Sequence, residues 1–173
     1  MNSEPKIEQR ATHPYAAIRM QVPIPFGKYL QPAWSRVESW LAVQRRAHGP
    51  AIIRYLTTDM SSQLDIDVGF IIRRAIPGAD GIFTGVLPAG RYATLTYTGS
   101  YRGKGVYRAN VALIGWAKSH GVVWKTSRVD GKEWWDSRVE WYFNDPTSDP
   151  HPEKYKTELT FRVAAAPRRK RTA

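Results

Sequence analysis

An internal repeat constrains the fold of this 173-residue chain more than any other feature of its sequence. Apolar residues recur at helical spacing over residues 29–47 and again over residues 105–119, which predicts two amphipathic helices. Each predicted helix leads into a His-Gly dipeptide, at 48–49 and at 120–121, in which glycine suits the left-handed position that follows a helix. The two dipeptides lie 72 residues apart. Repetition at such an interval indicates a duplicated structural unit.

β-strand patterns flank both predicted helices in the same order, with one strand before the helix and two after it. An additional strand connects the two halves, and a final strand is expected over residues 155–163. We therefore predict an α+β fold. Duplicated β-α-β-β halves, at about 14–75 and 82–164, would form one antiparallel sheet with two helices and a cleft at the pseudo-twofold axis. The expected strands of the halves are 15–22, 51–57 and 64–73, then 92–97, 122–126 and 134–143.

The strand pattern over residues 138–146 places a single carboxylate, Glu140, among aromatic and β-branched residues. Because side chains alternate across a strand, Arg138, Glu140 and Tyr142 share one face. A carboxylate in such surroundings is costly unless it is paired, hydrated or in contact with a ligand. Two interpretations follow: a surface ion pair with Arg138, or an anionic anchor at the bottom of an aromatic pocket.

The 72-residue offset aligns Val68 with Glu140 and Phe70 with Tyr142. On this alignment the first half contributes an apolar wall to the cleft, and the second half contributes an acidic one. A flat, hydrophobic and positively charged molecule would suit both walls, because aromatic faces and carboxylates attract cations. We expect Trp34 and Tyr107, on the two predicted helices, to approach the same cleft.

Four stretches of the sequence are similar to the GyrI-like small-molecule-binding family, over roughly residues 14–164. This family includes effector-binding domains of multidrug-responsive and AraC-type transcription regulators, and it shares the duplicated fold of the SOUL haem-binding proteins. The matching stretches are Leu87-Pro-Ala-Gly-Arg-Tyr-Ala93, Tyr97-Thr-Gly-Ser-Tyr101, Leu113-Ile-Gly-Trp-Ala-Lys-Ser-His-Gly121, and Glu140-Trp-Tyr-Phe-Asn-Asp-Pro146 with the closing strand 157–163.

The resemblance implies a binding pocket in which Glu140 takes the place of the family's buried, ligand-facing glutamate. Tyr142 would line the same wall, and Trp116 would approach from the second helix. The closing strand departs from the family, because Thr160 and Arg162 stand where relatives often carry an aromatic residue and a proline. No helix-turn-helix pattern accompanies the domain, so we expect a stand-alone member without an intrinsic DNA-binding domain.

Three functions remain open from the sequence. The leading hypothesis is a protein that binds hydrophobic, cationic or polyaromatic small molecules. The second is an enzyme similar to family members that hydrolyse strained cyclopropyl rings of genotoxic natural products, with Glu140 as general base and Tyr142 as acid or orienting donor. The third is a gyrase-inhibitor-like role in protein interaction. Whether the chain is an enzyme stays undecided at this stage.

Composition narrows the remaining possibilities. No cysteine is present, and the four histidines share no spacing typical of a metal site, so we expect neither metal nor cofactor. No run of about 18 apolar residues occurs, so we expect no membrane span and a cytoplasmic location. We expect a flexible N-terminus over residues 1–13 and a basic tail over residues 165–173. The net charge of +11 includes four tail residues that could contact polyanions weakly: Arg168, Arg169, Lys170 and Arg171.

Overall fold

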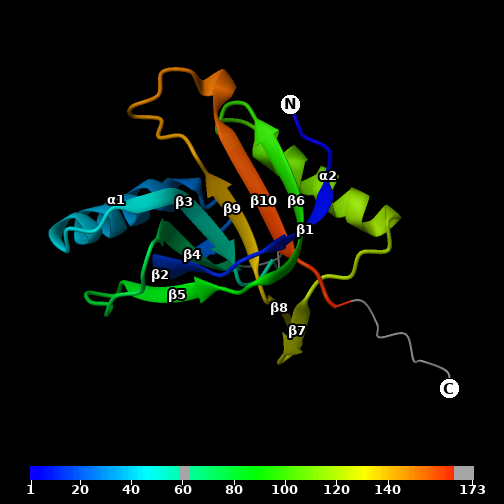
Figure 1. Ribbon diagram of the computed structural model, residues 1–173, viewed down its shortest axis with the longest axis horizontal. Coiled ribbons are helices and arrows are strands. Elements are labelled where there is room, and N and C mark those ends of the chain that lie inside the picture. Colours follow the sequence, from blue (N-terminus) through cyan, green and yellow to red (C-terminus); the bar gives the residue numbers. More distant parts are fainter. Residues whose placement is uncertain (59–62, 166–173) are drawn as a thin grey trace.

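The computed structural model describes residues 1–58 and 63–165, which form two helices and one large sheet (Figure 1). Within these residues, no helix is both long and apolar enough to cross a bilayer. In chain order the elements are β1 (Lys6–Arg10), β2 (His13–Pro23), α1 (Gly27–Val43), β3 (His48–Tyr55), β4 (Gln63–Ile72), β5 (Phe83–Leu87), β6 (Gly90–Thr98), α2 (Gly105–Ser119), β7 (Thr126–Val129), β8 (Lys132–Trp135), β9 (Arg138–Tyr142), the 3₁₀ turn η1 (Pro152–Lys154) and β10 (Lys156–Arg162).

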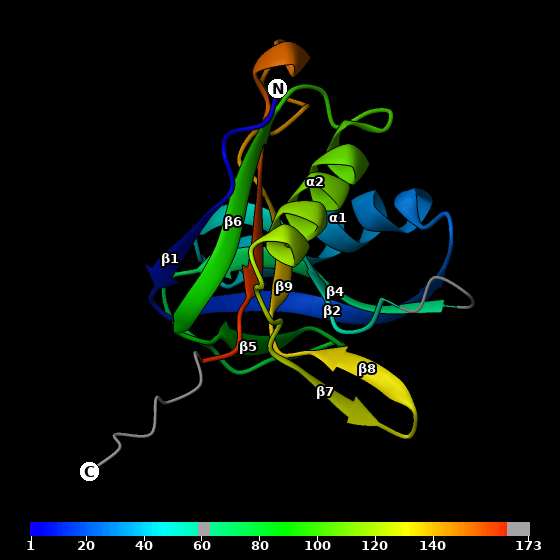
Figure 2. The same cartoon turned by 90° about the vertical axis from the view of Figure 1, so that its right-hand side faces the viewer.

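Eight strands form a curled antiparallel sheet in the order β1-β6-β10-β9-β3-β4-β2-β5. Helix α1 packs on β2, β3 and β4, whereas α2 packs on β6 and β10. The register places Val68, under α1, in the same transverse row as Leu159, under α2, so both helices cover one face of the sheet. Figure 2 shows the helices side by side on this face. The predicted α+β class, with one antiparallel sheet and two helices, is confirmed.

The duplicated units are β2-α1-β3-β4 and β6-α2-β9-β10, with β3 and β9 adjacent at the centre of the sheet. Only the second unit carries an inserted hairpin, β7–β8, between its helix and β9. The hairpin projects from the sheet in Figure 2. A constant 72-residue offset therefore fails. The alignment of Val68 with Glu140, and of Phe70 with Tyr142, is wrong because β4 corresponds to β10 and not to β9.

Both helices end in the same hydrogen-bonded motif. In α1 this motif lies earlier in the chain than the sequence pattern predicted. After α2, Gly121 adopts a positive φ of 63°, and the N–H of Val122 donates to the carbonyl of Ala117 at 2.9 Å. After α1, Arg45 adopts a φ of 53°, and the N–H of Arg46 donates to the carbonyl of Leu41 at 2.9 Å. These bonds define a Schellman motif at both ends. The prediction that α1 continues to residue 47, with Gly49 terminating it, is wrong.

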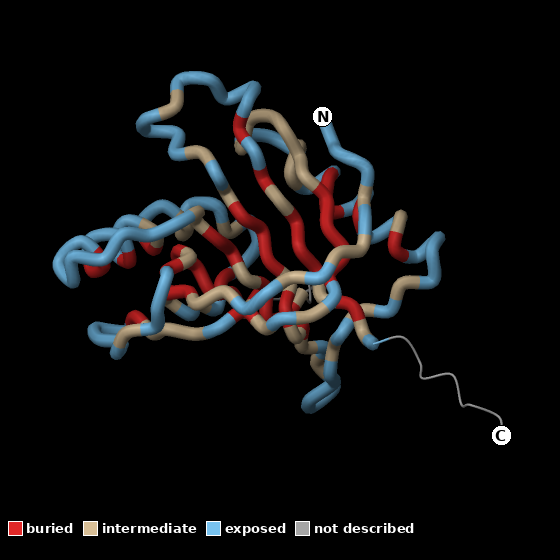
Figure 3. The backbone as a smooth tube through the Cα atoms, viewed as in Figure 1, coloured by how far each residue is buried: buried red, intermediate tan, exposed pale blue. Residues whose placement is uncertain are grey.

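The N-terminal segment contributes an ordered edge to the sheet. Residues 1–13, expected to be flexible, contain β1, which pairs with β6 from Lys6–Thr94 to Arg10–Gly90. Ile7 also packs against the apolar cluster under α2. Figure 3 shows buried backbone concentrated in the central strands, with the outer sides of both helices exposed. The basic residues 168–171 lie outside the described part of the chain.

Candidate functional site

The Glu140 carboxylate lies on β9, beneath the helices, and only 4% of the residue is exposed. Three neutral groups donate hydrogen bonds to it. The hydroxyls of Tyr142 and Tyr55 donate to Oε2 at 2.6 and 3.1 Å, and the side-chain amide of Asn110 donates to Oε1 at 2.8 Å. These donors come from β9, β3 and α2, so both halves of the chain hold the carboxylate. Within the described residues, Glu140 makes no direct ion pair.

A guanidinium occupies an aromatic cage next to this carboxylate. Arg138, two residues before Glu140 on the same strand face, lies over the rings of Phe161, Trp135 and Tyr55 at 4.4, 4.8 and 5.6 Å. Its Nη2 donates to the carbonyl oxygen of the Asn110 amide at 3.2 Å, so Asn110 bridges the cation and the anion. Burial lowers the pKa of Arg138. The surface ion pair between Arg138 and Glu140, one of the two interpretations of the sequence, is absent among the described residues, and an amide-bridged arrangement is found instead.

Burial keeps both tyrosines at the site in the neutral, donating form. The pKa of Tyr142 and that of Tyr55 are raised well above the usual value, first because of burial and then because of the nearby Glu140 charge. Ionising either phenol would place a second negative charge beside the carboxylate. The hydroxyls therefore act as donors to Glu140 throughout the neutral pH range.

Partly exposed aromatic rings connect this buried site to the surface. The Tyr142 ring contacts Trp34 of α1 at 5.6 Å and Tyr101 at 5.0 Å between ring centres, both edge to face. The Trp34 indole N–H donates to the carbonyl of Ile52 at 3.3 Å, which fixes the ring against β3. Glu140, Tyr142 and Trp34, three of the candidates named from sequence, are thus brought together.

Val68 and Phe70 share the helix-covered face with Glu140 and Tyr142, one strand removed from them. The register pairs Ile53 with both Val68 and Glu140, and pairs Ala51 with both Phe70 and Tyr142. Phe70 itself packs with His48 at 4.2 Å between ring centres, in the apolar cluster under α1. These two candidates line the same face without touching the carboxylate.

The two remaining candidates lie elsewhere. Trp116 packs against the apolar cluster between α2 and β6 and stacks on His120 at 4.6 Å. Tyr107 is 63% exposed on the outer side of α2. Glu158, on the neighbouring strand, pairs in register with Trp141 and so faces the opposite side of the sheet, where it binds Arg10 at 2.9 Å. It does not form a second carboxylate beside Glu140.

Sequence reasoning missed two direct partners of Glu140, namely Asn110 and Tyr55. A signal exists for Asn110, because it falls within the buried stripe of α2, next to Ala109 and one turn before Leu113. Tyr55 shares a strand face with Ala51 and Ile53 by simple alternation. Its position against Glu140 depends on the pairing of β3 with β9, which the sequence does not specify.

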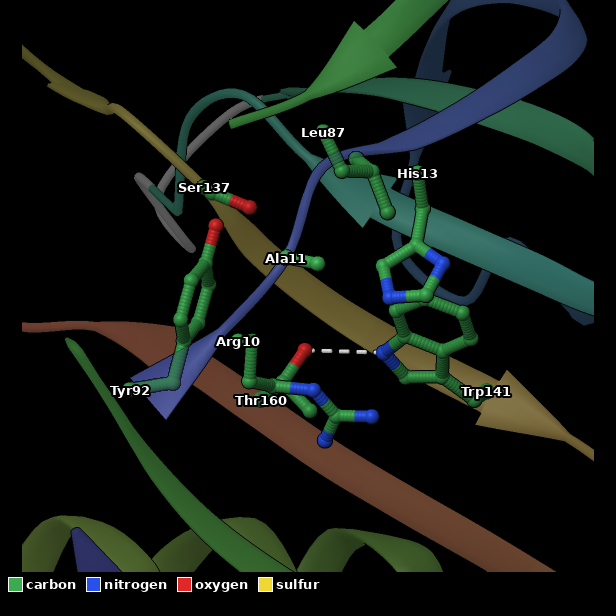
Figure 4. A pocket seen from close by; sticks show the side chains of 8 residues that line it. All are labelled: Arg10, Ala11, His13, Leu87, Tyr92, Ser137, Trp141 and Thr160. Atoms are coloured by element: carbon green, nitrogen blue, oxygen red, sulfur yellow. Dashed lines mark hydrogen bonds between the residues drawn. The ribbon is translucent and has the colours of Figure 1, made fainter. Parts of the chain in front are cut away.

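The opposite face of the sheet holds only a very small cavity in the region drawn in Figure 4. Its volume is about 10 Å³, enough for about one water molecule. Figure 4 shows Arg10 and His13 around the Trp141 ring, whose indole N–H donates to Thr160 at 2.8 Å. This cavity is too small for an organic ligand. The candidate site is the buried Glu140 carboxylate, because donors from three elements converge on it.

A comparison with known protein families identifies the family of this chain. Residues 3–164 match the model of the GyrI-like small molecule binding domain. The chain belongs to this family. No curated protein matches the sequence significantly.

Solved structures resemble this GyrI-like chain in fold at identities of 15% or less. The C-terminal domain of EcmrR has a TM-score of 0.75 at 14% identity, with 94% of this chain and 98% of that one covered. In the EcmrR–DNA complex in EcmrR-RPo, the TM-score is 0.76 at 15% identity, and the match covers 94% of this chain but only 58% of that one.

Two further structures with the fold of this GyrI-like chain are a ligand-bound protein and a hydrolase. SAV2435, bound to tetraphenylphosphonium, has a TM-score of 0.61 at 13% identity, covering 94% of this chain and 95% of that one. A hydrolase encoded by lin2189 from Listeria innocua has a TM-score of 0.62 at 12% identity, covering 93% and 92%. Identities this low show a shared fold alone. The function of this GyrI-like chain is therefore inferred from its own residues.

Proposed function

We propose that this GyrI-like domain binds hydrophobic cations that carry aromatic rings, and that Glu140 is the anionic centre of the site. The observation that carries the proposal is a buried carboxylate whose three hydrogen-bond donors are all neutral. Neutral donors stabilise the negative charge without cancelling it. A cationic ligand would therefore still gain electrostatic energy at this position.

The Arg138 cage shows that aromatic rings beside Glu140 already hold one cation, although Arg138 itself fills that cage. Three aromatic rings already surround a guanidinium within 5.6 Å, one bridging amide away from Glu140. Aromatic faces attract cations most strongly where water is excluded. A lipophilic cation, tetraphenylphosphonium, is bound to SAV2435, which shares the fold.

Tyr142 is the proposed point of entry. Its hydroxyl lies on the buried carboxylate, and its ring lies against the partly exposed Trp34 and Tyr101. Rotation of this one side chain would vacate one of the two hydrogen-bond positions on Oε2 of Glu140, leaving that of Tyr55, and would open aromatic surface to a ligand. Trp34 and Tyr101 would then contact the ligand's rings, while Val68 and Phe70 stay beneath α1.

The geometry favours binding over the two alternatives. As a general base, Glu140 would need an open acceptor position within reach of water, yet the residue is only 4% exposed and three donors use three of its roughly four positions. A gyrase-inhibitor-like role has no specific observation in its favour. The basic residues that could contact polyanions, 168–171, lie outside the described part of the chain, so that contact rests on sequence alone.

Calorimetric titration with tetraphenylphosphonium tests the proposal. Glu140→Gln preserves the size of the side chain and removes its charge, so we expect binding to weaken at least about tenfold, equivalent to about 1.4 kcal/mol. Triphenylphosphine oxide, a neutral molecule with similar rings, should lose much less affinity.

Glu158→Gln is the matched control, because it removes a carboxylate from the adjacent strand on the opposite face. Its affinity for tetraphenylphosphonium should equal that of the wild-type protein. Equal weakening in both variants would mean that overall charge, and not the Glu140 site, attracts the cation. Unchanged binding in Glu140→Gln would disprove the assignment.

A further inference from the structure

Two arginine pairs that are distant in the sequence line one cavity at the end of α1. Arg45 and Arg46 follow the helix, and Arg73 and Arg74 follow β4. The cavity they share has a volume of about 250 Å³. All four residues are exposed, and within the described part of the chain none of them forms an ion pair.

The same cavity has an apolar floor. Leu41 is fully buried, Ile72 is 5% exposed, and Ile76 packs against the cluster to which both belong. Cationic walls over an apolar floor match a molecule with an acidic group on a small hydrophobic body. The volume is slightly below the 300–1,000 Å³ that is usual for drug-sized ligands, so the molecule must be small.

The other half of the molecule provides an internal comparison. Its helix ends in the same motif with Gly121 and Val122 where the first half has Arg45 and Arg46. Beyond that helix, the N–H of Ala164 donates to the carbonyl of Val123 at 2.8 Å, so the two chain segments are bonded directly. The helix-ending motif therefore requires no arginine at these two positions.

Arg45 adds an independent observation, because it occupies a left-handed backbone position with a φ of 53°. A residue other than glycine is disfavoured there, and such strain persists chiefly where it serves a purpose. The conformation places the Arg45 side chain on the wall of the cavity.

We propose that this cavity is a second binding site, specific for small organic anions that carry one carboxylate, sulfonate or phosphate group on an apolar body. The guanidinium groups bind the acidic oxygens through paired N–H donors, and the floor takes the apolar part. The site is separate from the Glu140 site and has the opposite charge preference.

Calorimetric titration with naphthalene-2-sulfonate tests this proposal. Two double variants, Arg45→Gln/Arg46→Gln and Arg73→Gln/Arg74→Gln, should each weaken binding at least tenfold. The neutral 2-naphthalenemethanol should bind the wild-type protein at least tenfold more weakly than the sulfonate. Glu140→Gln should leave sulfonate binding unchanged, which separates this proposal from the preceding one.

Arg108→Gln/Arg128→Gln is the matched control, because it removes two exposed positive charges elsewhere on the surface. It should bind the sulfonate as the wild type does, and thermal melting confirms that each variant is folded. Equal weakening in this control would show that net charge alone attracts the anion. Full affinity in both cavity variants, or no saturable binding of the sulfonate by the wild-type protein, would overturn the proposal.

Discussion

Glu140 carries its negative charge into the interior because neutral donors from three elements converge on it. Such an arrangement depends on each donor, since a buried group that loses its partner incurs its full desolvation cost. Asn110 serves both charged side chains of the site. Its amide donates to Glu140, and its oxygen accepts from Arg138.

We expect Asn110→Ala to lower the free energy of unfolding by about 3 kcal/mol, because it removes one hydrogen-bond partner from the buried Glu140 and one from the partly buried Arg138. Urea denaturation measures this loss. Ser119→Ala, which removes one exposed hydroxyl from the same helix, should cost less than about 1 kcal/mol. A similar small loss for Asn110→Ala would show that the amide bridge contributes little to stability.

Tyr15 makes stability sensitive to alkaline pH. Burial, reinforced by the Asp67 charge, raises the pKa of Tyr15 to about 12, against 10.0 for a free phenol. The folded state therefore holds the phenolic proton more tightly than the unfolded chain. Its contribution is complete below pH 10 and is lost between pH 10 and 12, by up to about 3 kcal/mol.

The corresponding prediction compares the wild-type protein with Tyr15→Phe in urea denaturation at pH 9, 10 and 11. Other buried tyrosines titrate in both proteins, so the difference between the two curves isolates Tyr15. Stability of the wild type should fall more steeply above pH 10. Parallel curves would mean that the Tyr15 pKa is not raised.

The helix ends show what a repeated element retains and what it changes. Both helices end in a Schellman motif, one with Gly121 and the other with Arg45 at the left-handed position. The chain thus preserves the backbone geometry of the motif while the side chain differs. No contact within 4 Å would obstruct a Cβ at Gly121, so its conformation alone favours glycine there.

We expect Gly121→Ala to lower the unfolding free energy by about 1 kcal/mol, and Arg45→Gly to raise it by up to about 1 kcal/mol. For a chain of this length, each change corresponds to roughly 2–4 °C in the melting temperature. Gly115→Ala in the middle of α2 is the control. It is the same chemical change in equally open space, and it should stabilise the helix instead.

The helices and strands were largely predictable from sequence, whereas the pairing of strands and the long-range side-chain contacts were not. Alternation correctly placed Glu140 and Tyr142 on one strand face, and helical spacing correctly placed α2. The end of α1 was missed because Arg45 occupies the left-handed position after the helix, where the sequence usually has glycine. Tyr55 was missed because the pairing of β3 with β9 is a long-range contact, and the β7–β8 hairpin was missed because it interrupts only one copy of the repeat.

The molecule as a whole is a curled sheet whose two edges approach one another around Trp141. Arg10 of β1, at one edge, and Leu87 of β5, at the other, both line the small cavity beside that ring (Figure 4). The Arg10 guanidinium lies over Trp141 at 5.3 Å. The N-terminal strand therefore closes the sheet as well as covering an edge of β6.

Removal of residues 1–10 should lower the melting temperature by several degrees and promote association, because β6 would become an exposed edge. Thermal melting and light scattering measure both effects. Lys6→Gln/Glu8→Gln, which retains the strand but removes the ion pairs of Glu8 with Lys6 and with Arg10, should change neither appreciably. An unaffected truncated protein would support the flexible N-terminus that the sequence suggested.

The left-handed conformation of Arg45 also has a genetic consequence. Every arginine codon differs from a glycine codon by a single base, so the more stable glycine lies one mutation away. A library selected only for heat resistance should recover glycine at this position readily. A library selected for binding of the anion should keep arginine. Glycine at position 45 favours stability, whereas arginine favours ligand binding.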